Sequence, residues 1–122
     1  MTDCNVCRDL LAAAVNGHLK CLKYLHEEQG YEWNQETCAG AACAGQLNCL
    51  KYIFEDSKND ENGCPWDEST CYYAVSNGHL NCVKYACENG CPISYRVCLT
   101  IPIKYDCNTM FIYLIGLNAR WV

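Results

Sequence analysis

A ten-residue segment occurs twice in almost the same form in this chain of 122 residues. NGHLKCLKYL begins at Asn16 and NGHLNCVKYA begins at Asn77, and a weaker copy, AGQLNCLKYI, begins at Ala44. The glycines at positions 17, 45 and 78 set the period at 28 and then 33 residues. Such a period is typical of stacked repeat arrays, in which each unit buries its apolar side against its neighbours.

Other positions keep the same register and predict two short helices in each unit. Asn34, Asp67 and Ser94 occupy equivalent places, and each is a residue type that caps the first turn of a helix. In the third unit we expect one helix from Asp67 to about Gly78 and a second from about Leu80 to Gly90. Four residues of each second helix match across the copies: Cys21, Lys23, Tyr24 and Glu27; Cys49, Lys51, Tyr52 and Glu55; Cys82, Lys84, Tyr85 and Glu88.

We therefore expect an all-α fold, a short and gently curved solenoid of four helix-turn-helix units. It forms a single domain over residues 1–122, with units at about 4–33, 34–66, 67–93 and 94–122. The acidic stretch from Asp56 to Glu61 lengthens the second unit, and we expect it to extend only a solvated loop. Lys84 and Glu88 lie four residues apart on the exposed side of their helix, where they can pair weakly.

The motifs resemble those of the ankyrin-repeat family. AAVNGHL from Ala13 and AVSNGHL from Ala74 are similar to its helix pattern, and GCPWD from Gly63 is similar to its Gly-Ala-Asp-Val-Asn ending. Without the insertion in the second unit, the spacing is shorter than the ~33 residues of an ankyrin unit, and the Thr-Pro-Leu-His turn is missing, so we expect no β-hairpin fingers. The shortened form is similar to ankyrin-like proteins of giant viruses of amoebae. The resemblance implies a non-catalytic module that binds another protein.

The third unit carries the candidate partner-binding residues. Tyr72 and Tyr73 replace an Ala-Gly pair of the second unit, and Ser76 and Asn77 align with variable first-helix positions that ankyrin binders use. Tyrosines among small polar residues are well suited to protein contacts. Successive helix positions diverge by about 100°, so at most one tyrosine can face inward. We expect Tyr72 to be exposed; the alternative is that one tyrosine only fills space beside a neighbour.

The last unit lacks the charges of the earlier second helices. Phe111 and Ile115 stand where the third unit has a lysine and a glutamate. Terminal units of repeat arrays usually have a polar outer face. Two interpretations remain open: the tail from Leu117 to Val122 covers these residues, or they form an interface. We predict a homodimer through Phe111, Ile115 and Trp121.

Thirteen cysteines are many for a chain of this length. The start of the chain lacks the form of a secretory signal peptide, so we expect a reducing, cytoplasmic location, in the host cytoplasm or the virion if the protein is viral. The number is odd, and a disulfide framework is not expected in that compartment. Three roles remain open for the thiols: small apolar fillers, metal ligands, or redox groups.

Most cysteines repeat in register, as small core positions do. Cys4 and Cys7 form the one Cys-x-x-Cys pair, which supplies only two of the four ligands that zinc needs. We therefore expect no metal and no cofactor, and the alternative function is a thiol-rich metal-binding or redox protein. Cys64 and Cys91 fall in loops, where we expect exposure and oxidation. The cysteines interpreted as packing residues are Cys21, Cys49, Cys82, Cys38, Cys71 and Cys98.

Charge and motif content exclude other functions. The net charge of −5 without a basic run argues against nucleic acid and anionic membranes as partners. The longest apolar run, Met110 to Leu117, is too short to cross a bilayer of about 30 Å. His18 and His79 lack a neighbouring nucleophile or acid, so we expect no enzyme. A purely structural role, such as a virion component, is a second alternative.

The remaining predictions concern the environment of individual histidines, a glutamine and two tryptophans. We expect the His18 and His79 rings, and Gln46 at the equivalent place, to bond to backbone across the corner of their own unit. Trp33 and Trp66 occupy the family's buried valine position, so we expect both in the core. His26 stands alone on a helix face, and we expect it to be solvated.

Overall fold

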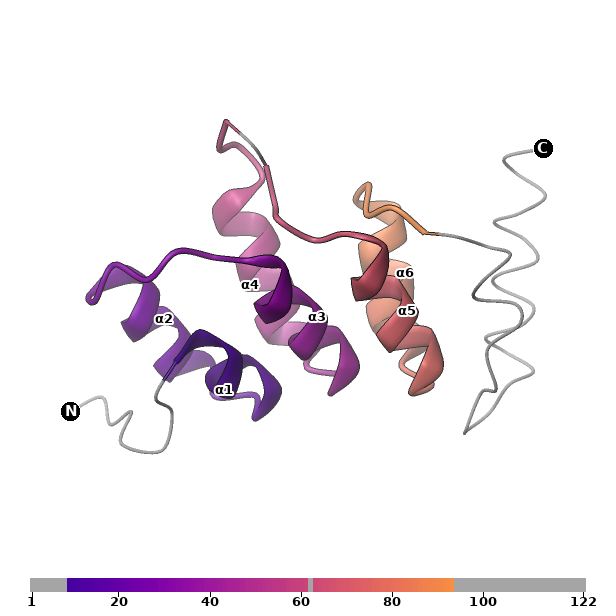
Figure 1. Ribbon diagram of the computed structural model, residues 1–122, viewed down its shortest axis with the longest axis horizontal. Coiled ribbons are helices and arrows are strands. Elements are labelled where there is room, and N and C mark those ends of the chain that lie inside the picture. The colour runs from indigo at the N-terminus through magenta and orange to yellow at the C-terminus, as the bar shows by residue number, and fades with distance from the viewer. Residues whose placement is uncertain (1–8, 62, 94–122) are drawn as a thin grey trace.

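The computed structural model describes residues 9–61 and 63–93, and over these residues it is all-helical (Figure 1). Three pairs of antiparallel helices follow one another along the chain, so the predicted fold class is confirmed. The described loops contain no strand, which leaves no β-hairpin between those units. The predicted fourth unit, with Ser94 and Cys98, lies outside the described residues, as do Cys4 and Cys7. The helices are α1 Leu10–Val15, α2 Leu19–Glu27, α3 Gln35–Cys43, α4 Leu47–Ser57, α5 Glu68–Ser76 and α6 Leu80–Glu88.

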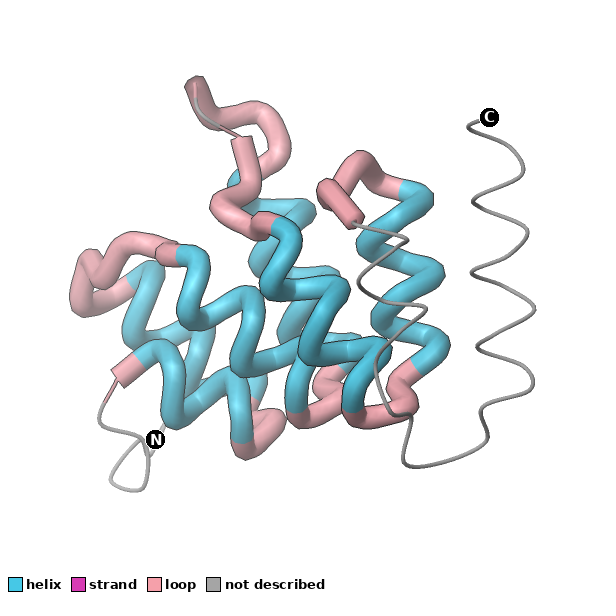
Figure 2. Tube along the Cα trace, turned by 45° about the vertical axis from the view of Figure 1, so that its right-hand side comes forward, coloured by secondary structure: helices cyan, strands magenta, loops and turns pink. Residues whose placement is uncertain are grey.

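The helices form two layers. The first helices of the units, α1, α3 and α5, lie side by side in one layer, and α2, α4 and α6 form the other (Figures 1 and 2). Contacts between neighbouring first helices are far more extensive than those between second helices. Alanines let the first helices approach closely, because a methyl group occupies little space; the fully buried ones are Ala13, Ala14, Ala41, Ala42 and Ala74. The second layer is spaced instead by aromatic side chains.

Side-chain caps fix where the first helices begin. Asp9 accepts a hydrogen bond from the Ala12 amide at 2.8 Å. Asn34 accepts one from the Thr37 amide at 2.9 Å. Asp67 caps α5 through the Ser69 amide at 2.9 Å. The predicted caps Asn34 and Asp67 are therefore confirmed.

The glycine after each first helix forms a tight corner, as predicted. At the second corner the Gly45 amide bonds to the Ala42 carbonyl at 3.2 Å and the Gln46 amide bonds to the Ala41 carbonyl at 2.8 Å. This Schellman pattern needs a left-handed residue, and Gly45 has a φ of +73°. The corners at Gly17 and Gly78 repeat the same bonds.

A side chain of the following unit lies over each of the first two corners. A Cβ on Gly17 would stand 2.6 Å from Gln46 Oε1, and one on Gly45 would stand 2.6 Å from His79 Nδ1. Gln46 also donates to the Val15 carbonyl of the preceding unit at 3.1 Å. The prediction that these side chains bridge the corner of their own unit is wrong for Gln46 and His79, which contact the corner before it.

The acidic insertion does more than lengthen a loop. Helix α4 has 11 residues, whereas α2 and α6 have nine each. The two extra residues are Asp56 and the buried Ser57, whose hydroxyl donates to the Ile53 carbonyl at 2.6 Å. The expectation of a purely solvated loop is wrong, because this part of the insertion continues the helix and packs against the first unit.

Candidate functional site

The outer sides of α1, α3 and α5 form one surface, which we call the first-helix surface. Large side chains stand at its two ends: Leu11 and Val15 on α1 are 40% and 38% exposed, and Tyr72 and Tyr73 on α5 are 38% and 43% exposed. The aligned positions on α3 hold small residues, among them Gly40. A Cβ on Gly40 would lie 2.6 Å from the Leu11 Cδ1 atom, so the leucine leans over the central helix.

The two tyrosines share the outer side of α5. Tyr72 is exposed, as predicted, and Tyr73 is exposed as well, because Cys71, Ala74 and Val75 supply the buried side of that helix. The two rings meet edge to face, with centroids 5.4 Å apart and planes at 83°. Neither ring fills the core, so both are available for contact.

The other two predicted partner-binding residues are half-buried. Asn77 caps the C-terminus of α5, where its Nδ2 atom donates to the Tyr73 carbonyl at 2.9 Å and lies 3.4 Å from Cys43 Sγ on α3. Asn16 makes the equivalent bond to the Ala12 carbonyl at 2.8 Å. Asn77 thus has an internal structural role, and Ser76 lies beside it.

The recurring lysine, tyrosine and glutamate connect consecutive units. The Tyr52 hydroxyl donates to Glu27 Oε2, and Lys23 Nζ lies 5.2 Å from the centre of the Tyr52 ring. Burial, and then the Glu27 carboxylate, raise the pKa of Tyr52. The next junction repeats the arrangement: the Tyr85 hydroxyl lies 3.4 Å from Glu55 Oε2, and Lys51 Nζ lies 5.6 Å from the Tyr85 ring centre. In units one and two, the lysine and the glutamate thus contact the tyrosine of the following unit.

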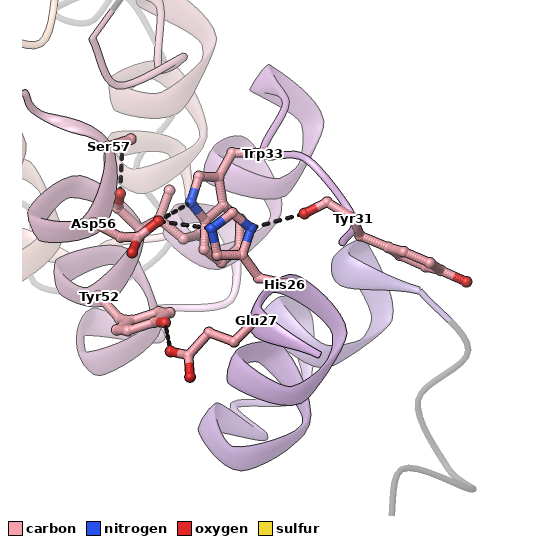
Figure 3. Close-up of polar contacts among 8 residues, drawn as sticks. His26, Glu27, Tyr31, Trp33, Tyr52, Asp56 and Ser57 are labelled. Carbon is pink, nitrogen blue, oxygen red and sulfur yellow. Dashed lines mark hydrogen bonds and ion pairs between the residues drawn. The ribbon is translucent and has the colours of Figure 1, made fainter. Parts of the chain in front are cut away.

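A polar cluster joins units one and two (Figure 3). His26 Nε2 lies 2.7 Å from Asp56 Oδ2, and Nδ1 lies 2.7 Å from the Tyr31 carbonyl oxygen. Trp33 Nε1 donates to the same Asp56 oxygen at 2.9 Å, and the Trp33 ring stacks on His26 with centroids 4.1 Å apart. The expectation of a solvated His26 is wrong. Both ring nitrogens are engaged in these contacts, which hold the ring at the junction between the two units.

The junction between units two and three has a similar ring stack, but an apolar ring replaces the histidine. Phe54 aligns with His26 and stacks on Trp66, with centroids 4.8 Å apart and planes at 19°. Tyr85 meets both rings edge-on. Trp66 is buried, as predicted, and Trp33 is partly buried against the core.

The loop cysteines differ from the prediction and from each other. Cys64 is half-buried, but Cys91 is only 5% exposed. The loop after α6 folds back, and the Cys91 thiol contacts the Asp67 carbonyl at 3.4 Å. The expected exposure of Cys91 is therefore wrong. The in-register cysteines are buried as predicted: Cys21, Cys38, Cys49, Cys71 and Cys82.

Within residues 9–61 and 63–93, no group of three or more His, Cys, Asp or Glu side chains is placed to hold a metal ion. None of the described helices is long and apolar enough to cross a membrane. The predicted self-association residues Phe111, Ile115 and Trp121 lie outside the described part of the chain.

Comparison with known proteins identifies the repeats. A family model described as ankyrin repeats (3 copies) matches residues 10–97, which is well over half of the chain. No curated protein and no solved structure gives a significant match. The matched region begins at α1 and contains all six described helices.

Proposed function

This chain belongs to the ankyrin-repeat family, a family of protein-interaction modules, and we propose that it is a non-catalytic module that binds another protein through its first-helix surface. The observation that carries the proposal is the pair of exposed aromatic rings on α5, Tyr72 and Tyr73. Large rings with few rotatable bonds give much contact area at a low entropy cost, which suits them to binding surfaces.

The opposite layer is a poorer candidate. Its recurring tyrosines Tyr52 and Tyr85 are half-buried and already contact the glutamates and lysines of the preceding unit. On the first-helix surface, by contrast, Leu11 and Val15 add apolar area at the other end, with small residues between. A partner helix or loop that lies across the first-helix surface fits this arrangement, with Ser76 and Asn77 at the edge.

A capture experiment with matched variants tests the surface. The full-length protein and the Tyr72→Ala/Tyr73→Ala variant are used as bait in host cell lysate, and bound proteins are quantified by mass spectrometry. The control is Tyr31→Ala, since Tyr31 is 43% exposed and lies in the loop after α2. We expect specific proteins that the double variant loses by tenfold or more and the control retains. If both variants keep the same proteins, this surface is not the binding site.

Self-association is a separate part of the proposal. It rests on the apolar residues Phe111, Ile115 and Trp121 of the last predicted unit. Light scattering on the full-length protein measures it directly, and a Phe111→Lys/Ile115→Glu variant restores the charge pattern of the earlier units. We expect a dimer that the variant dissociates, and a monomer at high protein concentration contradicts this interface.

We also propose a viral origin, with the protein in the host cytoplasm or the virion. The support is the shortened unit with its Gly-Cys-Pro-Trp-Asp and Cys-Leu-Lys-Tyr segments. Proteomics of purified particles tests this, and it also separates a partner-binding role from that of a structural virion component.

A further inference from the structure

The first helices carry negative charge and no positive charge. Helices α1, α3 and α5 contain no lysine or arginine, and their charged side chains are Glu36 on α3 and Glu68 on α5. The lysines of the described residues lie on the second helices or at the end of one: Lys20, Lys23, Lys51, Lys58 and Lys84. Over the described residues, the first-helix layer thus has carboxylates but no lysine of its own.

These carboxylates lie at one edge of the first-helix surface. Glu36 precedes Gly40 by four residues and Glu68 precedes Tyr72 by four, so each glutamate lies one turn closer to the start of its helix on the same side. Both glutamates are exposed, and α3 and α5 begin at the same edge of the array (Figure 1). Asp9, also exposed, caps the start of α1. We call Asp9, Glu36 and Glu68 the acidic edge.

The opposite edge of the surface is polar without such charges. There the first helices end and the corners follow, with the sequences NGHL at 16–19, AGQL at 44–47 and NGHL at 77–80. These segments contain no lysine, arginine or carboxylate. Between the two edges lie the exposed side chains of Leu11, Tyr72 and Tyr73. The surface is therefore apolar in its middle and acidic on one side.

Carboxylates of the second layer already have partners within the protein. Glu55 Oε1 lies 2.8 Å from Lys58 Nζ, and Asp56 Oδ2 lies 2.7 Å from His26 Nε2. The glutamates of the acidic edge lie instead on the layer whose helices contain no lysine or arginine. They are therefore the carboxylates that a positively charged partner can reach.

We propose that the first-helix surface binds a basic amphipathic segment of the partner protein. Its apolar side chains lie on Leu11, Tyr72 and Tyr73, and its arginine or lysine side chains lie along the acidic edge. This inference rests on the proposed function and adds the chemistry of the partner. Opposite charges across an interface steer the encounter and fix its register. Arginine and lysine can also cover apolar surface with their aliphatic stems while their charged ends reach a carboxylate.

The spacing of the helices sets the length of this segment. Axes of packed helices lie about 8–10 Å apart, so α1 and α5 are separated by about 16–20 Å. A helix rises about 1.5 Å per residue, so a helical segment of about 11–14 residues crosses all three first helices. Side chains three or four residues apart share one side of a helix. The segment thus needs an apolar stripe with basic residues along one flank.

Peptide selection against the full-length protein tests this chemistry without a known partner. A displayed library of random peptides of about 16 residues, long enough to cross the surface as a helix, is selected in reducing buffer at low salt. We expect enriched peptides to combine leucine or aromatic residues with several arginines or lysines. Raising the salt concentration from about 0.05 M to about 0.5 M should weaken their binding, because salt screens exposed charges.

Matched variants locate the charges. Glu36→Gln/Glu68→Gln removes two charges from the acidic edge, and Glu28→Gln/Glu88→Gln removes two from the C-terminal ends of α2 and α6. Fluorescence anisotropy with a selected peptide should show a dissociation constant about fivefold to thirtyfold higher for the first variant, and within about twofold of the unmodified value for the second. Circular dichroism verifies that both are folded. Glu36→Lys/Glu68→Lys should instead enrich peptides rich in aspartate and glutamate.

The outcomes separate this inference from the proposed function. Tyr72→Ala/Tyr73→Ala should weaken the selected peptides by about tenfold or more. If it does so but the peptides carry no excess of arginine or lysine, or both glutamine variants bind equally, the inference fails and the proposed surface stands. If the tyrosine variant binds as well as the unmodified protein, the peptides lie elsewhere and both fail. A selection that enriches no peptide also overturns the inference.

Discussion

The corner at Gly45 gives a quantitative test of how neighbouring units fit together. An alanine at Gly45 would keep a left-handed backbone, which costs about 1–2 kcal/mol for a residue with a Cβ. The new Cβ would also stand 2.6 Å from His79 Nδ1. Moving that ring adds an overpacking cost of about 1–3 kcal/mol. Alanine also lowers the conformational entropy of the unfolded chain, which stabilises the folded state by about 0.4–1 kcal/mol. Together, these effects should make Gly45→Ala lower the free energy of unfolding by about 2–4 kcal/mol.

A matched glycine and a double-mutant cycle separate the two costs. Gly30 also has a left-handed backbone, with φ of +77°, but nothing lies within 4 Å of a Cβ placed there. Gly30→Ala should therefore cost about 1 kcal/mol. Urea unfolding in reducing buffer measures both variants, and Gly45→Ala is repeated in a His79→Ala background. There its cost should fall to that of Gly30→Ala. Equal losses at the two glycines, or no coupling to His79, would refute the claim that the corners are shared between units.

Three further changes probe the core, the polar junction and the thiols. Ile53→Ala should lower the free energy of unfolding by about 2–5 kcal/mol, because the side chain is fully buried, and urea unfolding measures this. Asp56→Ala removes the acceptor shared by His26 and Trp33; it should cost about 1 kcal/mol, since both members of the ion pair are partly exposed, and a change within error of zero contradicts this role. Burial raises the pKa of the Cys82 thiol from 9.0 to about 11. The thiol of the unfolded chain ionises at lower pH than the buried one, so this contribution to stability is complete below about pH 9 and is lost as pH rises toward 11. Between pH 9 and 11, the melting temperature of Cys82→Ala should therefore fall less steeply than that of the unmodified protein.

Local features of the fold could be predicted from the sequence. The glycine corners and the caps at Asn34 and Asp67 depend on a few adjacent residues, and their chemistry is the same in every unit. The in-register cysteines were recognisable as core positions for the same reason. Repetition of an entire unit left little choice of fold, because the same apolar pattern must be buried at each junction.

Contacts between units were harder to predict. The role of His26 depends on Asp56, which lies 30 positions further along the chain, in the part of α4 that extends beyond the length of α2 and α6. The alignment did hold a usable signal, since His26 occupies the place of Phe54 and each precedes a tryptophan that occupies the same place in its unit once the insertion is set aside. The burial of Cys91 had no such signal, because it follows from how one loop returns to α5.

The unequal spacing of the two helix layers has a geometric consequence. Methyl groups lie between neighbouring helices on one side of the stack, and rings such as Phe54 on α4 and Tyr85 on α6 lie between them on the other. Each ring pair acts as a wedge, so the array must arc away from the wedged side. The curvature of the array therefore depends on the size of the rings at a few positions. Replacing one of these rings by a smaller side chain would straighten the stack at that junction and move the residues of the first-helix surface further apart.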